Sequence, residues 1–224
     1  MPKQATEICI VPVVAGLDLT SGESKKIWHD GLKTITSVPG CLSLFWGRQI
    51  EHPDVVDMII EWESIDKHQD FMKSPSYAPF LESLTSLMAG APTIYHAEMG
   101  TELPFSGPGS APVTECLSLY FEESYAVSDF DSSFAKAREG MEKTAEEAQG
   151  LASGWVVEDV KHKGLGPEGA EGPGKMFWAV VGWPSVEAHM KYRGSEDFAK
   201  VIPYLREGPK GVEVHHVAFQ KFQG

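Results

Sequence analysis

The sequence predicts an α+β fold made of two copies of a β-α-β-β-α-β unit in tandem. The first observation is a pair of similar segments, WESIDKHQDF from Trp62 and WPSVEAHMKY from Trp183. They share Trp, Ser, His and an aromatic residue at one offset, 183 − 62 = 121. The second observation is that further matches lie in register on both sides of this pair. Internal repeats of this kind indicate a duplicated structural unit.

The further matches extend from the beginning of each half to its end. They pair TEICIVPVV at Thr6 with TECLSLYFE at Thr114, PGCLSLFWG at Pro39 with QGLASGWVV at Gln149, Leu84 with Leu205, and TIYHAEM at Thr93 with EVHHVAF at Glu213. The offset rises from 108 to 121 and returns to 120, as insertions in loops would produce. We therefore interpret the chain as a tandem duplication.

Local patterns predict the elements of the first half. Apolar residues at helical spacing indicate a first helix, which Pro39 and Gly40 end. Ser64 is expected to cap a second helix, which breaks near Pro75. In order, the predicted elements are a strand over 7–15, a helix over 21–38, strands over 41–49 and 55–63, the helix after Ser64, and a strand over 93–99.

The second half repeats this order of elements. They are a strand over 114–123, a helix over 128–149, strands over 151–162 and 176–183, a helix over 186–205 and a strand over 212–222. Two stretches are rich in Gly and Pro. One is a linker over 101–113, which separates predicted domains at 1–100 and 114–224. The other, at 164–174, is an insertion at a hairpin tip and is either a mobile loop or a lid.

The order β-α-β-β-α-β is that of the ferredoxin-like unit, a four-stranded antiparallel sheet with both helices on one face. One such unit leaves the other face of its sheet uncovered. Burying that face stabilises a protein by about 25 cal/mol per Å² of apolar area. We therefore expect the two sheets to stack inside one α/β barrel with the helices outside.

Composition and charge exclude several classes of function. The chain has 224 residues and a formal net charge of −13, which disfavours binding to nucleic acids or anionic membranes. No apolar run is long enough to span a membrane and no signal-peptide pattern is present, so we expect a cytosolic protein.

Cys9, Cys41 and Cys116 lie in apolar runs without metal-binding spacing, which predicts buried free thiols. The motifs of phosphate loops, zinc proteases and nucleophile elbows are absent.

Two motifs in each half resemble a known family. The strand ends EWES and GWPS, followed by helices that contain SPSYAPF and SEDFAKV, are similar to the dimeric α/β-barrel superfamily. Within it, the chain resembles the antibiotic-biosynthesis-monooxygenase-like and stress-responsive A/B-barrel proteins. The resemblance implies a ligand pocket between the sheet and the helices of each unit, but no single activity, because the superfamily hosts many chemistries. The duplication fits either a monomer with an internal pseudo-dimer or a homodimer.

Histidines on the second helix of each unit are candidate acid–base groups. His68 shares a helical face with Phe71, and His189 shares one with Tyr192. The neighbours on these faces are apolar, so the side chains are expected to point inward. A histidine can donate and accept protons near neutral pH. The alternative is that each histidine braces the sheet beside its tryptophan.

The last strands carry His96 and His216 at equivalent positions. An imidazole among apolar neighbours needs a hydrogen-bond partner. Each could be a satisfied core histidine, a pocket base or a haem ligand. Haem-degrading members of the superfamily use an asparagine on the first strand, a tryptophan and a histidine on the second helix. Trp62 and Trp183 match the tryptophan loosely, but the chain contains no asparagine.

Polyketide cyclases of the superfamily have a helix with the segment ESVETIQDY, which ESIDKHQDF of this chain resembles. Their catalytic tyrosine and histidine align with Phe71 and Tyr77 in the first half, and with Tyr192 and Phe198 in the second. Only Tyr192 is retained, so the resemblance does not imply the same acid–base pair. Tyr192 with His189 could replace it.

We therefore expect a cofactor-independent lyase, cyclase, isomerase or monooxygenase that acts on a small hydrophobic, aromatic or polyketide-like molecule of secondary metabolism. The expected catalytic residues are His189, Tyr192, His216, His68 and His96, and the expected substrate-binding residues are Trp62, Phe71, Tyr77, Trp183 and Phe198. No cofactor and no metal are expected. Phe71 faces Tyr192 in the alignment of the halves, and Tyr95 faces His215, so we expect activity in the second pocket. The alternatives are a haem-binding or haem-degrading protein and a non-catalytic ligand-binding protein.

Overall fold

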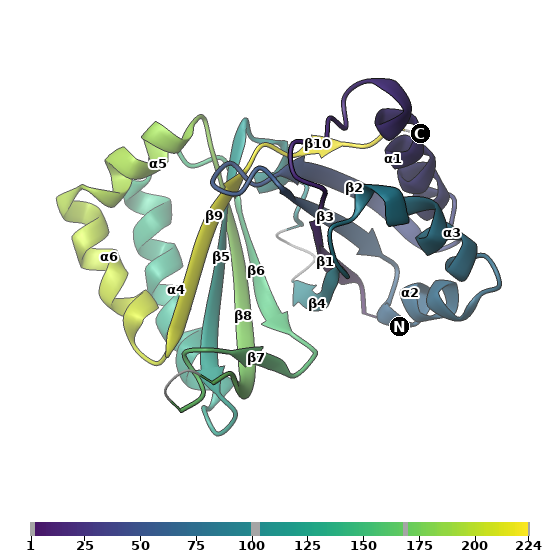
Figure 1. Cartoon of the computed structure of the whole chain (residues 1–224). Helices are drawn as coiled ribbons and strands as arrows, with labels where there is room; N and C mark the ends of the chain where they lie inside the picture. Colours follow the sequence, from purple (N-terminus) through teal and green to yellow (C-terminus); the bar gives the residue numbers. More distant parts are fainter. Residues whose placement is uncertain (1–2, 100–103, 168–169, 224) are drawn as a thin grey trace. The chain divides into compact units, whose positions relative to one another are not determined.

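The structure, a computed structural model, describes residues 3–99, 104–167 and 170–223. It contains two compact units, which we call the N-terminal unit (Met1–Thr101 with Val217–Gly224) and the C-terminal unit (Glu102–His216) (Figure 1). The sequence assigns residues 217–224 to the second half, whereas in the structure they belong to the N-terminal unit. The reason is strand pairing, because β10 (Gln220–Lys221) is hydrogen-bonded to β2 (Cys41–Arg48).

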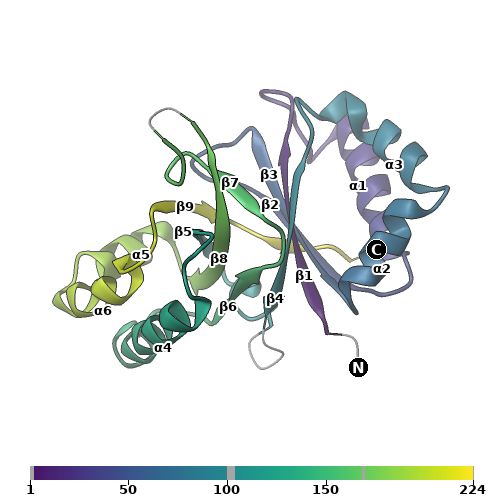
Figure 2. The same ribbon diagram turned by 90° about the horizontal axis from the view of Figure 1, so that it is seen from below.

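The N-terminal unit has the predicted order of elements. Besides β2 and β10, these are β1 (Ala5–Pro12), α1 (Gly22–Thr36), β3 (Val55–Trp62), α2 (Ile65–Lys73), α3 (Tyr77–Leu84), the 3₁₀ turn η1 (Thr85–Leu87) and β4 (Thr93–Met99). The strands pair in the order β10-β2-β3-β1-β4, and every pairing is antiparallel. The three α-helices lie together on one face of this sheet (Figures 1 and 2).

The C-terminal unit repeats this arrangement. Its elements are the 3₁₀ turn η2 (Pro108–Ser110), β5 (Val113–Glu122), α4 (Val127–Thr144), β6 (Leu151–Val156), β7 (Val160–His162), β8 (Gly172–Trp183), α5 (Val186–Arg193), α6 (Glu196–Arg206) and β9 (Gly211–Val217). The sheet order is β6-β8-β5-β9, and β7 pairs with β8. The predicted fold class, two ferredoxin-like units in tandem, is confirmed, while the stacking of the two sheets stays a prediction.

The strand registers show that the two units are copies of each other. Ala5 pairs with Trp62 in the N-terminal sheet, and Val113 pairs with Trp183 in the C-terminal sheet. The first strands are therefore related by an offset of 113 − 5 = 108, and the third strands by 183 − 62 = 121. These are the offsets of the sequence repeat, so corresponding residues of the two units can be compared one by one.

Several predicted boundaries are wrong for local reasons. The helix predicted over 186–205 is two helices, because the chain turns at Gly194 and Ser195 caps α6 by accepting a bond from the Phe198 amide at 3.0 Å. The helix predicted over 128–149 ends at Thr144. The strand predicted over 151–162 is split into β6 and β7, and the strand predicted from 176 begins earlier, at Gly172.

The predicted linker is partly a packed segment of the C-terminal unit. Phe105 is fully buried, and its ring stacks on Trp178 with centroids 6.1 Å apart. The Thr114 hydroxyl donates to the Pro108 carbonyl at 2.9 Å. Of the predicted linker, residues 101–103 lie outside the described residues, as do residues 168–169 of the predicted loop at 164–174.

Two equivalent glycines stand directly before the second strand of each unit. Gly40 has φ of +96° and Gly150 has φ of +91°, a region that side chains with a Cβ atom rarely adopt. A Cβ atom on Gly40 would also lie 2.6 Å from a side-chain atom of Lys67. The predicted stop signal at Pro39-Gly40 therefore reflects a real backbone requirement.

Each unit buries its core between its sheet and its helices. In the N-terminal unit Trp28 of α1 meets Trp46 of β2 edge-on, with ring centroids 5.5 Å apart. In the C-terminal unit five rings form what we call the aromatic cluster: Phe121, Phe130, Phe134, Trp155 and Phe177. Within the described ranges no helix combines the length and the apolar character that a membrane crossing needs.

None of the three cysteines, all of which the structure describes, is in a disulfide bond, and two of the three are buried, so the prediction of buried thiols holds for two. Cys9 and Cys116 are buried, and Cys41 is half-buried. Burial, followed by the charges of Glu7 and Asp57, raises the pKa of the Cys9 thiol well above its ordinary value. Cys9 therefore stays protonated and is a poor nucleophile.

The predicted helix cap at Ser64 differs from its counterpart in the second unit. Ser185 accepts a hydrogen bond from the Ala188 amide at 3.2 Å, whereas the Ser64 side chain makes no capping bond. We expect Ser185→Ala to lower the free energy of unfolding by about 1 kcal/mol. Ser64→Ala is the matched control and should cost clearly less. Urea unfolding followed by circular dichroism measures both, and equal losses would contradict the assignment.

Candidate functional site

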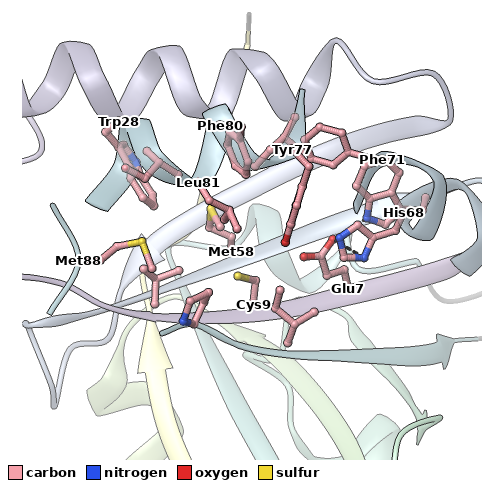
Figure 3. A pocket seen from close by; sticks show the side chains of 16 residues that line it. Glu7, Cys9, Trp28, Met58, His68, Phe71, Tyr77, Phe80, Leu81 and Met88 are labelled. Atoms are coloured by element: carbon pink, nitrogen blue, oxygen red, sulfur yellow. Dashed lines mark hydrogen bonds and ion pairs between the residues drawn. The ribbon is translucent and has the colours of Figure 1, made fainter. Parts of the chain in front are cut away.

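A network of four side chains joins the sheet of the N-terminal unit to α2. The Trp62 ring N–H donates to Glu7 Oε2 at 2.7 Å, and His68 Nδ1 lies 3.4 Å from the same oxygen. His68 Nδ1 is also hydrogen-bonded to His96 Nε2 at 2.7 Å. All four residues are buried. Figure 3 shows Glu7, His68 and Tyr77 converging on one end of the cavity under the helices.

The C-terminal unit contains the equivalent network. The Trp183 ring N–H donates to Glu115 Oε2 at 3.1 Å, and His189 Nε2 lies 3.3 Å from that oxygen. His189 Nδ1 is hydrogen-bonded to His216 Nε2 at 2.8 Å. Both ring nitrogens of His189 are therefore engaged, one by Glu115 and the other by His216.

Strand alternation and register explain why these side chains meet. Side chains on a strand point alternately to its two faces, so Glu7 shares the helix-facing side of β1 with Cys9. The register places Glu7 opposite His96 of β4. Trp62 ends β3, and α2 begins three residues later, so His68 in the first helical turn stacks on the Trp62 ring with centroids 5.1 Å apart. The same geometry recurs in the C-terminal unit, where the ring centroids of Trp183 and His189 are 5.2 Å apart.

The cavities beside the two networks differ about tenfold in volume. The cavity of the N-terminal unit measures about 50 Å³, and that of the C-terminal unit about 540 Å³. Small-molecule sites usually occupy about 300–1,000 Å³. Only the second of these two cavities is large enough for an organic substrate, and activity in this pocket stays a prediction.

Individual replacements contribute to the difference in volume. At the offset of 121, Met58 of β3 corresponds to Ala179 of β8, and Phe80 of α3 corresponds to Val201 of α6. Both exchanges remove bulk from the C-terminal unit. The first strand changes in the opposite direction, because Leu117 is larger than Cys9. The third strand and the last helix therefore both contribute space to the larger cavity.

Glu115 has the chemistry of an acid–base group on the cavity wall. Its side chain is 14 % exposed and lines the large cavity. Burial raises the pKa of the Glu115 carboxyl above its ordinary value, against the hydrogen bond from Trp183 and the charges of His216 and Arg193, which lower it. The hydrogen bond from Trp183 and the contact with His189 both use Oε2, and Oε1 makes no hydrogen bond to any described residue. Glu115 thus has an oxygen available for a ligand.

Three further polar side chains border the large cavity. The Tyr192 hydroxyl is hydrogen-bonded to Thr144 Oγ1 at 3.0 Å. Arg193 and Arg206 are exposed residues of the cavity lining, and neither forms an ion pair with a described residue. Their counterparts at the offset of 121 are Met72 and Thr85, so this positive charge is specific to the C-terminal unit.

The structure brings the ten predicted site residues together around the two networks. Trp62, Phe71, Tyr77, His68 and His96 cluster in the N-terminal unit, and Trp183, Tyr192, Phe198, His189 and His216 in the C-terminal unit. His96 and His216 stand behind the other histidines and do not line the cavities. The roles assigned to these residues stay predictions.

Sequence reasoning missed Glu7 and Glu115. A signal for them exists, because both first strands begin with Thr-Glu inside an otherwise apolar run, as TEICIV and TECLSL. A carboxylate on the inward face of a strand needs a partner. The equivalent histidines and tryptophans provide it.

The networks also contain groups that could bind a metal. Glu7, His68 and His96 each offer one ligand atom, and these atoms lie within 4.8 Å of one another. The four histidines that could ligate haem iron are instead hydrogen-bonded to each other in two pairs.

Each unit has the ferredoxin-like order of strands and helices with a pocket between sheet and helices, which is the architecture that the resemblance to the dimeric α/β-barrel superfamily implies. Residues 24–83 match the model of the antibiotic biosynthesis monooxygenase family. The matched residues lie in the N-terminal unit, and the C-terminal unit repeats its order of strands and helices. No curated protein sequence matches the chain.

Solved structures show the same fold over the whole chain. An anthrone oxidase-like protein is 14 % identical, with a TM-score of 0.62, and the match covers 98 % of this chain and 93 % of that one. A "putative monooxygenase" from Lactobacillus acidophilus is 11 % identical, with a TM-score of 0.61 and coverage of 98 % and 95 %. A protein of the same description from Fusobacterium nucleatum is 9 % identical, with a TM-score of 0.56 and coverage of 100 % and 99 %. At these identities the likeness establishes the fold and leaves the activity open.

Proposed function

We propose that the C-terminal unit is the active unit of a cofactor-independent enzyme that removes a proton from a small hydrophobic, aromatic or polyketide-like substrate. Glu115 is the general base. The observation that carries this proposal is a carboxyl group with an available oxygen on the wall of a cavity of about 540 Å³. A substrate in this cavity would lie within reach of the carboxylate and away from bulk water.

The environment of Glu115 suits a general base. A base is most effective when its pKa lies near the operating pH. Burial raises the pKa of Glu115 above its ordinary value, which moves it in that direction. The hydrogen bond from Trp183 and the contact with His189 hold one carboxylate oxygen in place, so the other is oriented for proton abstraction.

His189 and His216 are proposed to act through Glu115 rather than on the substrate. Both nitrogens of His189 are engaged, and His216 lies behind it. Glu115, His189 and His216 thus form a linear relay of contacts, in which His216 orients His189 and His189 holds Glu115 Oε2 in place. The predicted histidines are kept in the mechanism as positioning residues.

Tyr192 is proposed to stabilise the negative charge that develops on the substrate. Its hydroxyl lies at the cavity and is held by Thr144. A hydroxyl can donate to an enolate or phenolate oxygen as charge accumulates there. Arg193 and Arg206 add positive charge at the same cavity, which favours an anionic intermediate over a neutral ground state.

Among the predicted reactions, oxygenation has the most support. The family match is to antibiotic biosynthesis monooxygenases, and one structural neighbour is described as anthrone oxidase-like. For an anthrone, loss of a methylene proton gives a stabilised carbanion that can react with O₂. In the balanced reaction the CH₂ group becomes C=O, and the second oxygen atom leaves with the two hydrogens as water.

The two alternative functions, non-catalytic ligand binding and haem binding, do not fit the two units equally well. The N-terminal unit fits the non-catalytic alternative, because side chains fill most of its cavity. Haem binding would require one of the paired histidines to exchange its hydrogen bond for iron. A Soret band on addition of haemin would support that alternative.

Anthrone provides a direct test of the proposed function. With air present, the full chain is expected to convert anthrone to anthraquinone and to consume one O₂ for each product molecule, followed with an oxygen electrode and by absorbance. Without O₂, it is expected to catalyse exchange of the methylene hydrogens with deuterium from the solvent. Exchange without oxygen uptake would favour the isomerase or cyclase alternative. The absence of both above the buffer rate would contradict the proposal.

A further inference from the structure

We propose that the N-terminal unit binds one divalent transition-metal ion, with Zn²⁺ as the best-matched species, through Glu7, His68 and His96. This site is separate from the proposed catalytic cavity of the C-terminal unit. The proposal rests on one donor atom from each of Glu7, His68 and His96, which all lie within 4.8 Å of one another. Two imidazoles and one carboxylate form a typical ligand set for zinc.

The distances between the donors are close to those of a tetrahedral site. Zn–N and Zn–O bonds of about 2.0–2.1 Å place neighbouring donors about 3.4 Å apart. Glu7 Oε2 and His68 Nδ1 are 3.4 Å apart, so this edge already fits. His68 Nδ1 and His96 Nε2 are 2.7 Å apart, as hydrogen-bonded atoms are. An ion that replaces the shared proton would increase the distance between these two nitrogens by about 0.7 Å.

The surroundings supply what a bound ion needs beyond its three ligands. Glu7 accepts a hydrogen bond from the Trp62 ring N–H, and such outer contacts orient metal-binding carboxylates. The side chains of His68 and Glu7 are only 3 % and 6 % exposed, so competition from bulk water is weak. The adjacent cavity of about 50 Å³ exceeds the roughly 30 Å³ that one water molecule occupies. It can therefore hold a water as the fourth ligand, but it is too small for an organic substrate.

The equivalent residues of the C-terminal unit do not converge in this way. His189 presents Nδ1 to His216 and Nε2 to Glu115, and these two nitrogens lie on different sides of the imidazole ring. In the N-terminal unit one atom, His68 Nδ1, meets both partners. Corresponding residues have thus become a convergent donor set in one unit and a linear relay in the other. The C-terminal unit is therefore a built-in control for the metal site.

Titration of the metal-free full chain with Zn²⁺, followed by calorimetry, tests the proposal. We expect one ion per chain, and His96→Ala is expected to weaken the affinity at least 100-fold because it removes a ligand. His216→Ala is the matched control and should bind Zn²⁺ as the wild-type chain does. Binding that is absent from the wild-type chain, or equal in the two variants, would overturn the site.

Co²⁺ provides a second measurement that does not depend on one variant being folded. Co²⁺ in a four-coordinate site absorbs visible light more strongly than octahedral Co²⁺ in water. The wild-type chain and Glu115→Gln are expected to show this band, whereas Glu7→Gln is expected to lose it while its far-ultraviolet circular dichroism is unchanged. A band that persists in Glu7→Gln, or only the spectrum of aqueous Co²⁺ with the wild-type chain, would contradict the proposal.

Discussion

Replacement of Glu115 by glutamine is expected to lower the rate of proton abstraction by about 10²–10⁴-fold, the contribution of a well-placed general base. Glutamine has the size of glutamate and retains an oxygen that can accept the hydrogen bond from Trp183. It cannot take a proton from a substrate at neutral pH. The variant should therefore fold and bind the substrate, but lose turnover. The measurement is deuterium exchange into anthrone, with oxygen uptake as the second readout.

The assignment of Glu115 as the base also predicts how the rate of proton abstraction by the wild-type chain depends on pH. Only the carboxylate form of Glu115 accepts a proton, so the rate should fall as the pH is lowered through its pKa. Burial raises that pKa above 4.5, the ordinary value for glutamate, so the loss should begin at a higher pH than for an exposed glutamate. The residual rate of Glu115→Gln should lack this acidic limb.

Glu213→Gln is a suitable control for the substitution at position 115. Glu213 is half exposed, contacts His162 and Tyr120, and does not line the large cavity. It should retain the wild-type rate. If Glu115→Gln retained the rate within threefold, or if Glu213→Gln lost as much as Glu115→Gln, the assignment of the base would be wrong.

The second large effect is expected on stability. Phe130→Ala should lower the free energy of unfolding of the C-terminal unit by about 3–5 kcal/mol. Phe130 is fully buried on α4, and its ring centroid lies 4.7 Å from that of Phe121 and 5.1 Å from that of Phe177. Truncation would leave a void in the aromatic cluster, because rings on several sides cannot all move into the space.

Amide hydrogen exchange can assign this loss to one unit. If exchange occurs through unfolding of the unit, amides of β5 should exchange roughly 150- to 5,000-fold faster in Phe130→Ala. Amides of β1 in the N-terminal unit should change little. Equal acceleration in both strands would show that the units unfold together.

Phe134→Ala is the matched comparison, one helical turn further along α4. Phe134 is partly buried and already faces the large cavity, so its truncation enlarges an existing space rather than creating a new void. The loss of stability should be less than half of that for Phe130→Ala. A larger loss at Phe134 would mean that the cavity wall, rather than the aromatic cluster, holds α4 in place.

The fold of each unit and the positions of the histidines could be predicted from local spacing. A helical period placed His68 beside Phe71, and strand alternation placed His96 on the inward face. The repeat at offsets of 108 and 121 then transferred each prediction to the other half. Periodicity is a property of neighbouring residues along the chain, which explains why this reasoning succeeded for the helices and strands.

The hydrogen bonds between the histidines depend on contacts distant in sequence. His68 and His96 are 28 residues apart, and Glu7 is a further strand away in the sheet order. No periodic pattern reports which nitrogen faces which partner. Which nitrogen faces which partner decides that the N-terminal unit has a convergent donor set and the C-terminal unit a relay, although the residue types are the same.

The order of elements and the duplication follow from the amino-acid sequence alone, because local periodicity and repeated segments encode them. The volumes of the two cavities, the available oxygen of Glu115 and the return of β10 to the N-terminal sheet arise only when the chain is folded. Each depends on distances between packed side chains or on long-range strand pairing. A replacement such as Met58 against Ala179 changes the volume of a cavity without altering the pattern of apolar residues in the sequence.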